Sequence, residues 1–157
     1  MSMDMYREYI LQHYRRPRNY GSLDAPDFTH EDDNPLCGDE IRIEVKVDEN
    51  NIAEIGFQGK GCAICMASTS ILTGKVKGRD LDEVKALNKD DLLGWLRIPV
   101  SPMRLKCALL GMMVLQAGIH EYQKSAGATE QSSGSAPAPE SNGLPVRSQD
   151  LQRGPEN

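Results

Sequence analysis

The sequence predicts an α+β protein in which a small antiparallel sheet is covered by helices. Apolar and polar residues alternate with a period of two across residues 41–57, which indicates a β-hairpin with one polar face. Segments in which apolar residues recur at helical spacing precede and follow this hairpin. Because an isolated hairpin is not stable in water, we expect these helices to cover its apolar face.

The predicted hairpin is bounded by turn residues. Its first strand carries apolar side chains on one face and charged side chains on the other, namely Ile41, Ile43, Val45 and Val47 against Arg42, Glu44 and Lys46. Residues 48–51 form the turn, and the second strand continues the apolar face with Ile52, Ile55 and Phe57. We expect Gly59-Lys60-Gly61 to end the sheet. The polar, acidic segment 23–35 predicts an irregular surface segment.

Several further segments are typical of helices. Residues 3–13 have apolar side chains spaced by three and four, and Pro17 ends this helix. Shorter helices are expected over 62–77, 81–86 and 90–96. The longest helix begins at Pro102, after the N-cap candidate Ser101, and ends near residue 123. On it, we expect Met103, Met112 and Met113 to pack in the core.

Composition separates a folded domain from a tail. Residues 1–124 are predicted to form the domain, whereas the Gly-, Ser- and Pro-rich residues 125–157 are predicted to be disordered, because they contain too little apolar surface to fold. The net charge of −5 makes a general affinity for nucleic acid unexpected. We find neither a membrane-spanning segment nor a signal peptide and expect a cytoplasmic protein, whose cysteines stay reduced.

Three cysteines lie where an element begins or a loop ends. Cys37 precedes the first strand of the hairpin, Cys62 begins a helix, and Cys107 lies in the first turns of the last helix, after Lys106. The helix N-terminus at Cys62 and the ammonium beside Cys107 favour thiolates. With Asp39, the three sulfurs would make a four-coordinate set for zinc or iron. The alternative is that all three cysteines are small buried side chains.

Four motifs resemble the SufU/IscU family, whose members are similar to the NifU N-terminal domain. They are Tyr14-Arg15-Arg16-Pro17-Arg18-Asn19, Cys37-Gly38-Asp39, Gly59-Lys60-Gly61-Cys62 with Met66-Ala67-Ser68-Thr69-Ser70, and Arg104-Leu105-Lys106-Cys107-Ala108. The resemblance covers residues 5–123. It implies a three-stranded antiparallel sheet with about five helices, and a site for iron, a 2Fe–2S cluster or zinc formed by Cys37, Asp39, Cys62 and Cys107.

The resemblance implies two functions for this site. A scaffold would assemble a 2Fe–2S cluster from sulfur that a SufS/IscS-like cysteine desulfurase delivers as persulfide, and would pass the cluster to apo iron–sulfur proteins. A zinc-dependent sulfurtransferase would relay the sulfur instead. Cys37 is the expected persulfide acceptor in SufU-like members and Cys107 in IscU-like ones. The short segment 81–103 favours the scaffold, and Lys106 favours the relay. A structural zinc domain is a third possibility.

Other polar residues have less specific patterns. Cys65 follows Cys62 by one helical turn, so it is either a buried small side chain or a spare thiol near the site. His13, His30 and His120 have no motif context, and we expect packing or surface positions for them. Arg15, Arg16 and Arg18 form either a solvated helix end or a docking patch for an acidic partner. Residues 100–104 match a chaperone-binding sequence of IscU only in part.

Overall fold

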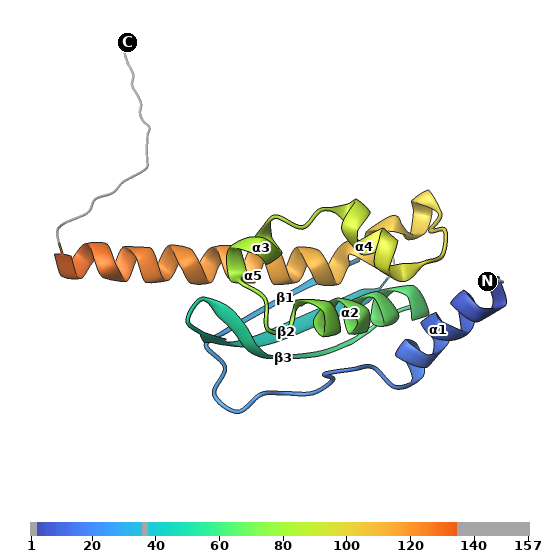
Figure 1. The fold of residues 1–157 in the computed structure, drawn as a ribbon, viewed down its shortest axis with the longest axis horizontal. Helices are drawn as coiled ribbons and strands as arrows, with labels where there is room; N and C mark the ends of the chain where they lie inside the picture. The colour runs from blue at the N-terminus through green and yellow to red at the C-terminus, as the bar shows by residue number, and fades with distance from the viewer. Residues whose placement is uncertain (1–2, 36–37, 135–157) are drawn as a thin grey trace, which may run out of the picture. The chain divides into compact units, whose positions relative to one another are not determined.

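A computed structural model describes residues 3–35 and 38–134, and it confirms the predicted α+β class. Strands β1 (Phe28–Asn34), β2 (Asp39–Asp48) and β3 (Asn51–Lys60) form an antiparallel sheet in the order β1-β2-β3 (Figure 1). The helices of the described residues are α1 (Met3–Arg15), α2 (Ala63–Val76), α3 (Leu81–Lys85), α4 (Lys89–Leu96) and α5 (Pro102–Gly134). The three strands implied by the resemblance are therefore present.

The β2–β3 hairpin has the register that the alternation predicts. Ile43 pairs with Phe57 and Val45 with Ile55, and all four side chains are buried on the same face. Glu49 and Asn50 connect the strands with φ angles of 52° and 66°. This left-handed backbone gives the turn the twist that a two-residue hairpin requires. Strand β3 continues through Gly59 to Lys60, past the expected end of the sheet, because Gly59 lets the carbonyl of Glu40 approach closely.

The expectation of an irregular segment over residues 23–35 is wrong for the residues of strand β1. Its sequence, FTHEDDN, is acidic and has no apolar alternation, yet it pairs with β2 from Phe28 to Asn34. Backbone hydrogen bonds to β2 hold this edge strand, so its side chains need not be apolar. Charged side chains on an edge strand also discourage pairing with other chains.

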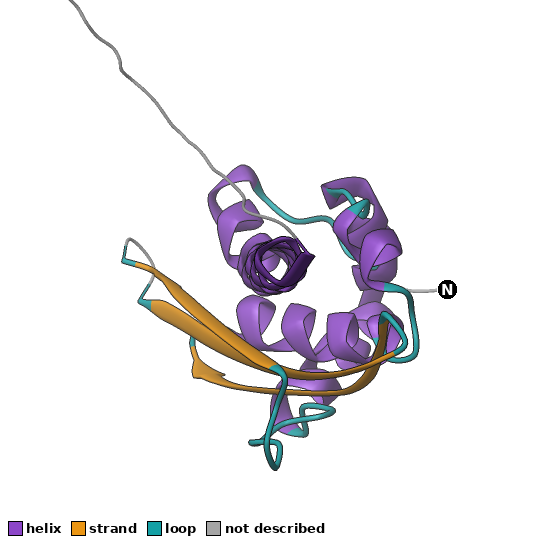
Figure 2. Ribbon diagram, turned by 90° about the vertical axis from the view of Figure 1, so that its left-hand side faces the viewer, coloured by secondary structure: helices purple, strands orange, loops and turns teal. Residues whose placement is uncertain are grey.

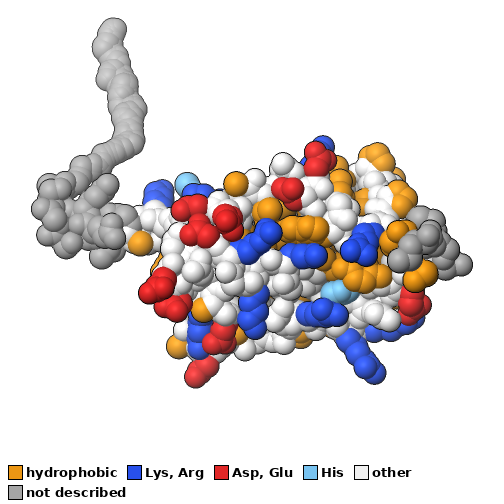
Figure 3. Space-filling view, viewed as in Figure 1, with side chains coloured by type: hydrophobic (Ala, Val, Ile, Leu, Met, Phe, Trp, Pro, Cys, Tyr) orange, Lys and Arg blue, Asp and Glu red, His pale blue; other side chains and the backbone are white. Residues whose placement is uncertain are grey.

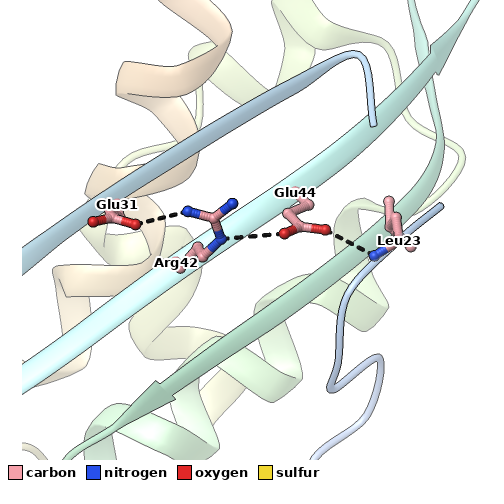
Figure 4. A network of polar contacts seen from close by, with 4 residues as sticks. All are labelled: Leu23, Glu31, Arg42 and Glu44. Atoms are coloured by element: carbon pink, nitrogen blue, oxygen red, sulfur yellow. Dashed lines mark hydrogen bonds and ion pairs between the residues drawn. The ribbon is translucent and has the colours of Figure 1, made fainter. Parts of the chain in front are cut away.

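The face of the hairpin that was expected to be solvated is partly covered. Glu44 is only 6% exposed, because residues 19–23 run beside β3. One carboxylate oxygen of Glu44 accepts the backbone N–H of Leu23 at 2.7 Å, and the other accepts the Arg42 guanidinium at 3.1 Å. Arg42 in turn donates to Glu31 of β1 at 2.8 Å (Figure 4). The buried charge is thus paired and hydrogen-bonded, as burial requires.

Helices α2 and α5 lie on the same face of the sheet (Figure 2). Helix α2 is buried from Cys65 to Thr73, and its small side chains allow close packing. A Cβ atom at Gly111 of α5 would collide with the Thr69 hydroxyl of α2, so these helices approach closely only because residue 111 is glycine. Gly118 of α5 likewise faces Phe28 and His30 of β1. The core therefore lies between the sheet and these two helices.

Two of the three methionine predictions for α5 are wrong. Met112 is buried (5% exposed), but Met103 and Met113 are 87% and 58% exposed. The buried face of the helix includes Met112, Leu115 and Ile119, which follow one another at spacings of three and four. Met113 points about 100° away from that face, and Met103 lies in the first turn, before the packed part begins.

Helix α5 ends at Gly134 and not near residue 123. No proline interrupts the chain between Pro102 and Pro137, so no residue in this segment removes a helical N–H. The chain divides into two units, Met1–His120 and Glu121–Asn157, and the first contains all the residues discussed below. The helix therefore includes residues 125–134 of the segment that was expected to be disordered, and disorder beyond Gly134 stays a prediction. Among the described residues, no helix is both long and apolar enough to cross a membrane.

Helix α1 is held against α2 by a buried polar network. His13 is 6% exposed, and its Nδ1 forms a 2.7 Å hydrogen bond with the Ser70 hydroxyl, which also accepts the backbone N–H of Arg18. The Asn19 amide donates to Thr73 Oγ1 at 3.1 Å. Burial lowers the pKa of His13, and the Arg18 guanidinium lowers it further. The expected packing role of His13 is confirmed.

This network predicts that acidification destabilises the fold through His13. Because the pKa of His13 is lower in the folded protein than in the unfolded chain, the unfolded chain binds the proton more readily. The stabilising contribution is present above the ordinary value of 6.5 and is lost as the pH falls below it. The free energy of unfolding, measured with urea at pH 7.5 and 5.5, should fall more for the wild type than for His13→Gln. Equal losses would contradict this role for His13.

Candidate metal and sulfur site

Three predicted ligands from three different elements converge. Asp39 begins β2, Cys62 is the N-cap of α2, and Cys107 lies in the second turn of α5. One carboxylate oxygen of Asp39 and the sulfurs of Cys62 and Cys107 all lie within 4.8 Å of one another. Sulfur ligands of a tetrahedral zinc ion lie about 3.8 Å apart, because each Zn–S bond is about 2.3 Å long. Small side-chain rotations would therefore bring the three atoms within bonding distance of a common metal ion.

The Asp39 carboxylate is buried, and its two oxygens differ. Oδ1 accepts the backbone N–H of Cys62 at 2.9 Å, so it fixes the carboxylate to the start of α2. Oδ2 is buried and has no hydrogen-bond partner among the residues that the structure describes, and Asp39 is 0% exposed. A buried carboxylate oxygen normally has a partner, because losing its hydration is costly. A cation shared with Cys62 and Cys107 would supply that partner.

The two cysteines differ in exposure. Cys62 is partly exposed, whereas Cys107 is 1% exposed. Cys62 has an extended backbone (φ −71°, ψ 166°), and its side chain makes no capping hydrogen bond. The sulfur of Cys62 therefore does not cap the helix that this residue begins. The site thus combines one sulfur accessible from outside with one that is enclosed.

Cys37, the fourth predicted ligand, lies outside the described residues. In the sequence it precedes Asp39, the first residue of β2, by two positions. A third sulfur near the carboxylate would complete a donor set that suits zinc or an iron–sulfur cluster.

Gly61 is a site residue that the sequence reasoning did not single out. A Cβ atom there would collide with Oδ1 of Asp39 and lie 2.9 Å from its Cγ. The glycine directly before Cys62 therefore provides the space in which the carboxylate lies. A glycine next to a candidate ligand is the signal that could have identified this role, but only the fold shows which side chain fills the space.

We expect Gly61→Ala to displace Asp39 from the site. The added methyl group should cost about 1–3 kcal/mol of folding free energy, as overpacking does, and should weaken metal binding. Gly74→Ala on α2 is the matched control, because within the described residues nothing beyond its neighbours and its own helix backbone lies within 4 Å of the added Cβ; it should stabilise the fold by about 0.5–1 kcal/mol. Metal titration and urea unfolding measure both effects. Unchanged metal affinity in Gly61→Ala would contradict this account.

The remaining candidates do not join this group of ligand atoms. Cys65 is fully buried in α2, as expected for a small packing side chain. Within the described part of the chain, the group of converging ligand atoms contains no histidine, and His30 is half-buried in β1 while His120 is exposed. The side chains of Arg15, Arg16 and Arg18 are exposed at the end of α1.

Comparisons with known proteins agree with this fold. The NifU-like N terminal domain family model matches residues 5–129. The iron-sulfur cluster assembly enzyme IscU of Drosophila melanogaster is 37% identical over 123 residues, which cover 76% of this chain and 79% of that protein. The zinc-dependent sulfurtransferase SufU of Bacillus subtilis is 32% identical over 132 residues, covering 73% and 89%. The N-terminal part of a NifU-like protein from Brucella abortus shares the fold, with a TM-score of 0.65, 22% identity, and coverage of 77% and 96%.

Proposed function

Because the chain belongs to the family of NifU-like N-terminal domains, we propose that it is an iron–sulfur cluster assembly scaffold. It accepts persulfide sulfur from a cysteine desulfurase and assembles a 2Fe–2S cluster for transfer to apo-proteins. The observation that carries the proposal is the convergence of Asp39, Cys62 and Cys107, whose ligand atoms lie within 4.8 Å of one another. Two sulfurs and a buried carboxylate oxygen, brought together from three elements, are ligand types that suit zinc or an iron–sulfur cluster.

The proposed ligand set is Cys37, Asp39, Cys62 and Cys107. In this proposal the thiolates bind iron and sulfide, which are the cargo of the protein, and the Asp39 carboxylate occupies the fourth position. A carboxylate is a harder, weaker ligand for such a cluster than a thiolate. Asp39 is also already hydrogen-bonded through Oδ1 to the N–H of Cys62, so it can release the cargo without losing every partner. These properties suit a site that must hand its cluster on.

Sulfur transfer requires one thiolate to act as a nucleophile. The thiolate attacks the outer sulfur of the desulfurase persulfide, a new S–S bond forms on the scaffold, and the desulfurase cysteine leaves as a thiolate. Reducing that sulfur to sulfide takes two electrons from an external reductant. Cys37 and Cys107 are the candidate acceptors. Cys107 is 1% exposed, so an approach by a desulfurase would require movement around it.

A zinc-dependent sulfurtransferase is the second candidate function. Lys106, directly before Cys107, favours it, as does the 32% identity to a relative named for that activity. In this alternative, the same four residues hold zinc, which keeps the thiolates deprotonated until the desulfurase docks. The partner would be the same desulfurase in both cases. The cytosol, where thiols stay reduced, is the proposed location for either function.

Metal and acid-labile sulfide analysis of anaerobically purified protein separates the two functions. The analysis is repeated after incubation with a cysteine desulfurase, cysteine and iron. A scaffold should become brown and contain iron and sulfide in equal amounts. A relay should stay colourless, contain one tightly bound zinc, and increase desulfurase turnover. Protein that binds neither iron nor zinc under these conditions would refute both.

A further inference from the structure

Beyond the metal site, the end of α1 forms a positively charged cavity. The cavity has a volume of about 590 Å³ and is lined by Gln12, His13, Arg15, Arg16 and Arg18. Every charged side chain in this lining is basic, although the whole protein carries a net charge of −5. Lysine and arginine side chains gather over this part of the molecule (Figure 3). A volume of this size is typical of small-molecule sites, which run from about 300 to 1,000 Å³.

Among the described residues, the arginines of this cavity have few ionic partners. Within residues 3–35 and 38–134, neither Arg16 nor Arg18 forms an ion pair with a carboxylate. Arg15 pairs with Glu8 at 3.3 Å, but both side chains are more than half exposed (62% and 55%), so this pair contributes little. Arg42, by contrast, is bound by Glu31 and Glu44. Arg16 and Arg18 therefore remain available to an external anion.

The wall of the cavity is rigid where it meets α2. His13 is buried and bonded to Ser70, and the Ser70 hydroxyl also accepts the backbone N–H of Arg18. The Thr73 hydroxyl lies 3.3 Å from the backbone carbonyl of Arg18 and 2.8 Å from that of Ser70, so its one proton is shared between them. The backbone of Arg18 is thus held by α2 mainly through its N–H, and its side chain projects from this anchored position. Such anchoring lowers the entropic cost of binding a ligand.

We propose that the cavity formed by Gln12, His13, Arg15, Arg16 and Arg18 binds a small oxyanion with two or more negative charges. Guanidinium groups present paired N–H donors that match phosphate and carboxylate oxygens. The ligand is therefore a polyphosphate or phosphate ester, or a polycarboxylate. A concave site favours a small ligand over the flat acidic surface of a partner protein.

Binding should be visible at His13 as well as in the arginines. The Arg18 guanidinium helps to lower the pKa of His13 in the protein alone. An anion beside Arg18 opposes this effect, so it should raise the pKa of His13. An NMR titration of the His13 ring, with and without inorganic pyrophosphate or citrate at constant ionic strength, measures this shift. Either anion can also remove metal from the metal site. Because His13 lies in the cavity, that removal does not mimic the expected change in the pKa of His13.

The test compares the full-length chain with two charge-matched double variants. Pyrophosphate or citrate should bind the wild type at one saturable site, and the stronger of the two identifies the ligand class. Arg16→Gln/Arg18→Gln should weaken binding about 100-fold, because each charge-assisted hydrogen bond contributes a factor of ten or more. Lys77→Gln/Lys89→Gln removes the same charge from exposed lysines outside the cavity and should leave binding unchanged. Arg18→Lys keeps the charge and should weaken binding less than the double variant.

Three outcomes would overturn the proposal. One is the absence of saturable binding of either anion in the millimolar range. Another is equal weakening in both double variants, which would indicate general charge attraction. The third is loss of desulfurase binding in Arg16→Gln/Arg18→Gln without competition by either anion, which would assign the arginines to an acidic protein surface. Cluster assembly at Asp39, Cys62 and Cys107 is measured separately, so failure here leaves the proposed function intact.

Discussion

Cys107→Ser should abolish stable metal or cluster binding. Its sulfur lies within 4.8 Å of the ligand atoms of Asp39 and Cys62, so serine would replace a soft thiolate with a poor neutral ligand at the centre of the group. Loss of an outer-shell partner alone costs about 10- to 100-fold in metal affinity, so loss of this ligand should cost more than about 100-fold. Competition with a chromophoric zinc chelator measures the affinity, and visible absorption after reconstitution measures the cluster.

Cys65→Ser is the matched control for that change. Both cysteines are buried (0% and 1% exposed), and both substitutions place a hydroxyl in a helix that packs against the core. Cys65 is not in the group of converging ligand atoms, so its replacement should leave metal stoichiometry unchanged. If Cys65→Ser loses metal as Cys107→Ser does, either Cys65 is a ligand or the loss reflects unfolding. Circular dichroism of the two variants distinguishes these causes.

Asp39→Ala should stabilise a bound cluster and slow its transfer to an apo-protein. The substitution removes the only oxygen ligand of the proposed set, whose weaker bond to a soft cluster is the easiest to break. We expect the lifetime of the cluster to rise about tenfold, which corresponds to about 1.4 kcal/mol. Transfer to an apo-ferredoxin, followed by circular dichroism in the visible range, measures the rate. A cluster that decays faster in the variant than in the parent would remove Asp39 from this role.

Asp27→Ala controls for the hydrogen bond that Asp39→Ala also removes. Asp39 Oδ1 accepts the N–H of Cys62 at 2.9 Å, and Asp27 Oδ2 accepts the N–H of Val47 at 2.6 Å. Each substitution therefore deletes one negative charge and one bond from a carboxylate to a backbone amide. Only Asp39 lies in the metal site. The cluster lifetime should change in Asp39→Ala and stay the same in Asp27→Ala, whereas both variants should unfold at lower urea concentration.

Local patterns were sufficient for elements whose stability depends on their own side chains. The β2–β3 hairpin was predictable because Ile43, Val45, Ile55 and Phe57 alternate with polar residues. Side chains that alternate in this way lie on one face of a β-strand, where they can be buried together. Pro102 marked the start of α5 because proline is tolerated at the first helical turn. The cysteines were identifiable as candidate ligands because few other residue types bind soft metals, and Asp39 was identifiable because it follows Cys37 by two residues.

Other features depended on contacts that no local pattern contains. Strand β1 is held by the backbone of β2, so its acidic side chains carried no strand signal. Glu44 appeared to lie on a solvated face, but residues 19–23 cover it and supply a backbone donor. Met113 appeared to belong to the core stripe of α5, but which face of a helix is buried depends on the elements packed against it.

The sequence by itself determined the class of the protein, the types of ligand and the family. The tertiary structure decided which ligands meet. Asp39 and Cys107 are separated by 67 intervening residues, and only the packing of α2 and α5 on one face of the sheet brings their side chains to Cys62. It also decided that Gly61 makes room for the carboxylate and that Arg16 and Arg18 share a cavity. The physical reason is that a binding site requires particular distances between its side chains. Packing determines these distances when the residues are far apart in the sequence.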